Sequence, residues 1–148
     1  MSDPFHEAKQ ALNSAKVEFT ATNSLSLVGA FAPLHAADLA LRDIYTLATG
    51  TPFPHDRFKP QHQPGGLVDA LGIKSYYSLD SQRFLNKLTG HALQDVRYEG
   101  TQAYKNYVST VSSDLAAELI KGAEQFTQET EALATNQNVL NTIKQNAR

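Results

Sequence analysis

Three polar residues of different chemistry recur along one Ala-rich segment, residues 32–45. His35, Asp38 and Arg42 occupy positions i, i+3 and i+7, within about 60° of one another on an α-helix. Because an unpaired polar group on an apolar face costs free energy, this stripe could form an inter-helix pocket that receives a phosphate or a partner's guanidinium. The alternative is a surface stripe whose Asp38–Arg42 pair contributes about 0.3–0.5 kcal/mol.

A second candidate is the Arg97-Tyr98 pair, which is followed by Tyr104. A guanidinium can bind a phosphate or carboxylate through two parallel hydrogen bonds, and a Tyr ring can stack on a base. The alternative is that Arg97 caps helix-end carbonyls while Tyr98 fills the core. Taken with the first stripe, the pair predicts a ligand site where the second helix meets the start of the last long helix, with Asp38 orienting Arg97 or Arg42.

Other potentially reactive residues do not form a recognised motif. His55, Asp56 and His62 are metal ligands by type, but no metal-site spacing is present and they lie in a Pro- and Gly-rich stretch, residues 51–66. A solvated loop is the better interpretation, so no metal site is predicted. The absence of cysteine excludes disulfides, thiolate catalysis and Cys-based zinc sites. The sequence implies no cofactor.

Helical periodicity dominates the elements that must position these residues. Apolar spacings of three and four predict a helix over 4–21, another from Asn23 or Ser24 to Gly50, short helices over 67–71 and 80–88, and a long helix beginning at Ser112 or Ser113. Pro33 should kink or divide the second helix. No run alternates at strand period, so we expect an all-α fold, an antiparallel up-and-down bundle of four to five helices.

Length and charge limit the domain organisation and the binding partners that we expect for the chain. A chain of 148 residues is typical of one domain. We expect the bundle to span 1–134 and the polar segment 135–148 to be a frayed helix or disordered. A net charge of -2 argues against general coating of nucleic acid, which needs clustered Lys and Arg. Neither a secretory signal nor a transmembrane run is evident, which favours a cytoplasmic protein.

Several short segments together resemble the HEPN (higher eukaryote and prokaryote nucleotide-binding) family of helical bundles. They are the opening helix 5–19, the Ala-rich acid-then-base segment 36–42, the segment 62–71, Val96-Arg97-Tyr98, and the helix 116–126. Many ribonucleases of this family carry an Arg followed by a His near the start of the last long helix. This chain departs from that pattern, because no His follows Arg97 there.

The resemblance implies a homodimer with a nucleotide- or RNA-linked binding role, beside a nucleotidyltransferase partner in a toxin–antitoxin-like or stress-related system. Its implied ligand-binding residues are His35, Asp38, Arg42, Arg97, Tyr98 and Tyr104. Two alternatives stay open. One is a metal-independent endoribonuclease that uses Arg97 and a displaced base, His91 or His62. The other is a purely structural dimerisation module. The sequence alone does not decide whether the protein is an enzyme.

Overall fold

The computed structural model describes residues 4–22, 27–54, 64–90 and 113–147. Its helices are α1 (His6–Thr22), α2 (Leu27–Thr49), α3 (Pro64–Ala70), the 3-10 helix η2 (Lys74–Tyr76), α4 (Leu79–Gly90), α7 (Ser113–Leu133) and α8 (Gln137–Asn146). The described part of the chain contains no strand, which confirms the all-α class. These residues form six α-helices rather than the four to five expected.

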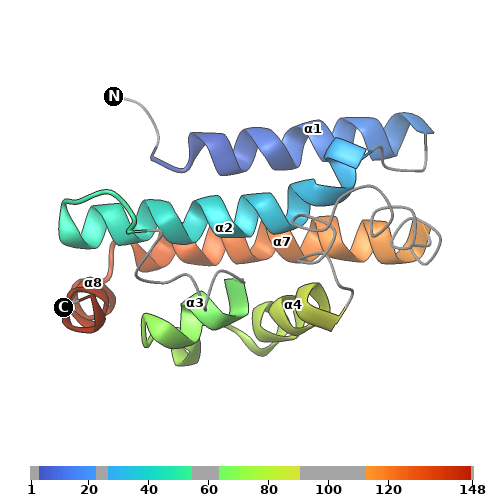
Figure 1. Cartoon of the computed structure of the whole chain (residues 1–148). Coiled ribbons are helices and arrows are strands. Elements are labelled where there is room, and N and C mark those ends of the chain that lie inside the picture. Colours follow the sequence, from blue (N-terminus) through green and yellow to red (C-terminus); the bar gives the residue numbers. More distant parts are fainter. Residues whose placement is uncertain (1–3, 23–26, 55–63, 91–112, 148) are drawn as a thin grey trace.

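The three long helices, α1, α2 and α7, pack side by side and run the length of the molecule (Figure 1). Two ion pairs, Lys9–Glu131 and Lys16–Glu124, join α1 to α7. Both pairs step by seven residues, up the chain in α1 and down it in α7, so the two helices are antiparallel. The short helices α3 and α4 cover one side of this layer, and α8 crosses the end of it (Figure 1).

The core lies between these helices and follows the predicted apolar stripes. Ala8 and Leu12 of α1 are buried together with Phe5, the residue just before α1, and so are Leu41 and Ile44 of α2. α2 also buries a run of small residues against its neighbours, namely Ala36, Ala37 and Ala40. Small side chains let helix backbones approach closely, so this Ala-rich face explains how α2 can sit between α1 and α7.

Glycine ends two helices as the sequence predicts. Gly50 follows α2 and Gly72 follows α3, and both have a φ of 73°, the left-handed conformation that favours glycine. Pro33 lies inside α2, which remains a single helix. Its first turns bend out of line with the rest (Figure 1), so the residue kinks the helix and does not divide it.

The last residues correct our expectation of a frayed or disordered tail. Residues 137–146 form α8, whose N-cap Asn136 accepts hydrogen bonds from the backbone N–H groups of Asn138 and Val139. Val139 and Ile143 are fully buried and belong to the main core. The polar composition was misleading, because Val139 and Ile143, with the partly buried Leu140 and Ala147, pack this segment against the main core.

Candidate functional site

The Asp38–Arg42 pair of the predicted stripe forms within α2. Arg42 Nη2 lies 2.8 Å from Asp38 Oδ2. The Asp38 side chain is only 2% exposed, whereas that of Arg42 is 30% exposed. The pair is therefore not the fully solvated surface pair of the alternative interpretation: a buried carboxylate holds a guanidinium whose other edge reaches the surface.

The chain that leaves α2 adds an aromatic contact to the same guanidinium. After Gly50 the backbone turns back, and the ring of Phe53 lies 5.7 Å from the Arg42 guanidinium carbon. This contact is within cation–π range. Phe53 is itself held edge-on by Tyr45, with ring centroids 5.3 Å apart and planes at 75°. Sequence reasoning missed Phe53, because it lies beyond the helix and its contact depends on the turn at Gly50.

One donor of this restrained guanidinium is left over. Arg42 Nε is buried and has no hydrogen-bond partner among the residues that the structure describes. A buried donor without an acceptor costs about 1–3 kcal/mol, and more for a charged group. We call Asp38, Arg42, Tyr45 and Phe53 the Arg42 cluster. Within the described residues, the Arg42 Nε–H group of this cluster lacks an acceptor oxygen.

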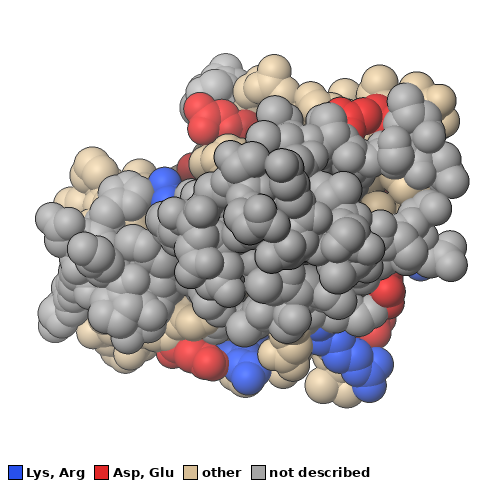
Figure 2. All heavy atoms as spheres, turned by 45° about the vertical axis from the view of Figure 1, so that its right-hand side comes forward, with Lys and Arg blue, Asp and Glu red and all other residues tan. Residues whose placement is uncertain are grey.

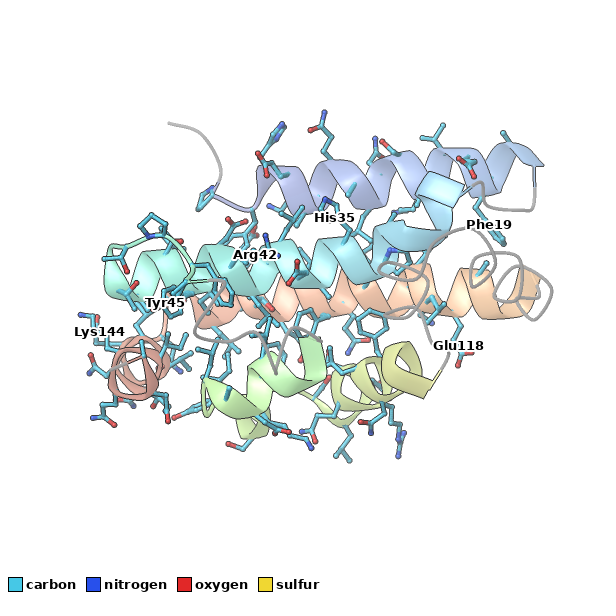
Figure 3. All side chains as sticks on the ribbon, in the orientation of Figure 1. Phe19, His35, Arg42, Tyr45, Glu118 and Lys144 are labelled. Atoms are coloured by element: carbon cyan, nitrogen blue, oxygen red, sulfur yellow. The ribbon has the colours of Figure 1, made fainter. Side chains whose placement is uncertain are left out.

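The third member of the stripe, His35, is exposed on α2. Figure 3 shows His35, Arg42 and Tyr45 following one another along this helix. His35 and Arg42 are seven residues apart, about two helical turns, and so lie on the same side of α2. An extended ligand anchored at Arg42 would pass His35.

The remaining predicted site residues lie outside the described part of the chain. These are Arg97, Tyr98 and Tyr104; His55, Asp56 and His62, for which no site is predicted, also lie outside the described residues. The expected approach of Arg97 to Asp38 therefore stays a prediction. Among the described residues, no group of three or more His, Asp or Glu side chains is arranged to hold a metal ion.

A second polar cluster, centred on Glu129 of α7, was not predicted. The backbone N–H and Oγ of Ser78 donate to its two oxygens at 2.8 and 2.7 Å, and Ser81 Oγ and Gln125 Nε2 donate at 2.8 and 2.9 Å. Ser78 Oγ also accepts from the backbone N–H of Ser81, so it caps the start of α4. This Glu129 cluster fastens α4 to α7.

The electrostatics of the Glu129 cluster follow from these bonds. Partial burial raises the pKa of Glu129, but the four hydrogen bonds from Ser78, Ser81 and Gln125 outweigh it and leave the pKa below its ordinary value. Beside it, burial raises the pKa of the Tyr77 phenol, a hydrogen bond with Thr130 (2.7 Å) lowers it, and the Glu129 charge raises it. The net pKa of Tyr77 is raised, so the phenol stays neutral. Every donor in this cluster has its acceptor, which marks it as a structural clamp.

On the face seen in Figure 2, described acidic and basic side chains lie next to one another along the lower edge. Within the described residues, no helix is both long enough and apolar enough to span a bilayer. Comparisons of the chain with protein-family models, curated proteins and solved structures found no match.

Proposed function

We propose that this protein is a helical binding module of the HEPN type that recognises the phosphate groups of a nucleotide or RNA at the Arg42 cluster. The observation that carries the proposal is the buried, unpaired Nε of a guanidinium already oriented by Asp38 and Phe53. A phosphate presents the acceptor oxygens that an arginine fork fits best.

The energetics favour such a ligand over a purely structural role for Arg42. Asp38 fixes the side chain before binding, so little rotamer entropy is lost when a ligand arrives. A hydrogen bond to the charged group contributes about 1.5–3 kcal/mol. The exposed His35, on the same side of α2, supplies a further donor to an extended phosphate backbone.

The test is fluorescence anisotropy with a short labelled RNA, with AMP and inorganic phosphate as competitors. Arg42→Gln should raise the Kd about tenfold or more, since it removes the charge-assisted hydrogen bonds. Arg42→Lys should bind with intermediate affinity, because lysine retains the charge but not the fork.

The matched control is Arg83→Gln. Arg83 pairs with Asp80 three residues away at 3.6 Å, but both side chains are 72% exposed. The control removes the same charge from the surface and should leave the Kd unchanged. An equal loss of affinity in both variants would mean that only net charge matters and would reject the Arg42 cluster as the site.

The assembly implied by the family resemblance remains a separate prediction. We expect a two-fold homodimer with an isologous helical interface. Light scattering at micromolar concentration checks it, and a monomer would contradict it. Co-purification with a nucleotidyltransferase would support the two-component system.

A further inference from the structure

A hollow lies alongside the second half of α1 and the middle of α7. The antiparallel seam between these helices is joined by the Lys9–Glu131 and Lys16–Glu124 ion pairs. Lys16 and Glu124 themselves line the hollow, which extends from Ala117 to Gln128 along α7. It is a groove of about 500 Å³, which we call the α1–α7 groove.

Apolar and polar side chains both line the α1–α7 groove. Phe19 of α1 and Ile120 of α7 form its apolar part with Ala117, and Thr20, Gln125 and Gln128 add polar groups to the charged residues of its rim. Phe19 and Ile120 belong to a small apolar cluster with Ala15 and Ala32, separate from the main core. The volume lies within the range of small-molecule sites.

The rim of the groove offers one cation for a ligand. Lys16 is 2.8 Å from Glu124 and so is already paired. Lys121, on the same rim, forms no ion pair with the described residues. Glu118 and Glu124 lie three residues to either side of Lys121 on α7. Their charges would oppose a doubly charged group more strongly than a single carboxylate.

We propose that the α1–α7 groove binds a small amphiphile, an apolar chain or ring that ends in one carboxylate. The apolar body covers Phe19 and Ile120, and the carboxylate lies against Lys121. The site is separate from the Arg42 cluster. Figure 3 shows Phe19 and Glu118 at one end of the bundle and Arg42 further along it.

The experiment is isothermal titration calorimetry of the full chain with octanoate. Ala117→Met should abolish binding by filling the groove; Ala117 is an exposed helical residue and Met is a good helix former, so the fold should persist. Ala132→Met, at another exposed position of α7, is the matched control and should bind as wild type. Lys121→Gln should raise the Kd about three- to fivefold. Lys144→Gln, on α8 at the opposite end of the bundle, should not (Figure 3).

Each outcome decides the proposal. Saturable octanoate binding that Ala117→Met abolishes and Lys121→Gln weakens supports it. Absence of saturable binding, or binding retained by Ala117→Met, overturns it. Octanol binding as tightly as octanoate, or an unchanged Kd in Lys121→Gln, overturns the carboxylate as the ligand class. Arg42→Gln should bind octanoate as wild type, so failure of the phosphate site and failure of this groove are distinguishable.

Discussion

Two carboxylates, Asp38 on α2 and Glu129 on α7, organise the polar interior in different ways. Glu129 accepts four hydrogen bonds: three come from Ser78 and Ser81 at the start of α4 and cross to α7, and the fourth comes from Gln125 within α7. Asp38 holds Arg42, its neighbour one turn along the same helix. The first arrangement joins two elements, whereas the second fixes the direction of one side chain.

The difference lies in which hydrogen bonds are complete. Around Glu129 each donor has an acceptor, so the cluster gains nothing from a ligand. At the Arg42 cluster the buried Nε of Arg42 has no acceptor, and part of the guanidinium is exposed. Mutation of Glu129 should therefore mainly lower the free energy of unfolding, whereas mutation of Arg42 should mainly lower ligand affinity.

Glu129→Ala should give the largest loss of stability. The change removes four hydrogen bonds and leaves the start of α4 without its link to α7, so the free energy of unfolding should fall by about 2–3 kcal/mol. Urea denaturation followed by circular dichroism measures this. Glu124→Ala, which removes a solvent-exposed ion pair with Lys16, should cost less than about 1 kcal/mol. Equal losses of unfolding free energy in Glu129→Ala and Glu124→Ala would refute the role of the Glu129 cluster as a structural clamp.

Asp38→Asn should lower both the free energy of unfolding and the affinity for RNA. It leaves the half-buried Arg42 charge without its counter-ion, which should lower the free energy of unfolding by about 1–2 kcal/mol, less than for a fully buried pair. It also frees the guanidinium to rotate, so RNA affinity should fall with stability. Denaturation and anisotropy on the same preparation measure the two effects. Wild-type affinity in a destabilised Asp38→Asn protein would show that orientation of Arg42 is irrelevant.

Acid should weaken the Glu129 cluster selectively. Because the folded-state pKa of Glu129 is lowered, its stabilising contribution is present above its unfolded-state pKa and is lost as pH falls through the folded-state value. Glu129→Gln should therefore be less stable than wild type near neutral pH, and the difference should shrink as pH falls below about 4. Urea titrations across this range test it; a constant difference would contradict the charge as the cause.

Arg42→Gln should have the smallest effect on stability. The Arg42 side chain is partly exposed, and the Gln amide can still donate a hydrogen bond to the buried Asp38 carboxylate, so the loss should be about 1 kcal/mol. Its main effect should be on ligand affinity, the reverse of Glu129→Ala. Thermal denaturation beside the anisotropy titration checks the contrast. A large loss of stability with unchanged affinity would place Arg42 among the structural residues.

The sequence was sufficient for much of the fold because its strong signals are local. The 3.6-residue periodicity predicts α1, α2 and α7, and Gly50 and Gly72 mark real helix ends. α8 was expected to be frayed or disordered because only three of its ten residues, Val139, Leu140 and Ile143, are apolar. Whether Val139 and Ile143 are buried depends on the surface that α8 packs against, and a local sequence pattern does not reveal that surface.

For the candidate site too, contacts within one helix could be predicted from the sequence, whereas contacts between elements could not. The Asp38–Arg42 pair follows from helical spacing and was predicted. The contact of Phe53 with Arg42 and the convergence of Ser78 on Glu129 join elements through turns and helix packing, so no spacing rule could find them. His35 is exposed, which fits the surface stripe of the alternative interpretation and not an inter-helix pocket, and the roles of Arg97, Tyr98 and Tyr104 stay predictions.

The most direct test of the Arg42 cluster as a binding site is the NMR signal of the Arg42 Nε–H group during titration with AMP. Our account predicts a large downfield shift of this proton as it gains a phosphate acceptor. The exposed Arg83 Nε–H should not shift, and the Arg42 signal should be absent in Arg42→Gln. An Arg42 Nε–H signal that stays in place at saturating AMP, or that moves no more than that of Arg83, would contradict the account.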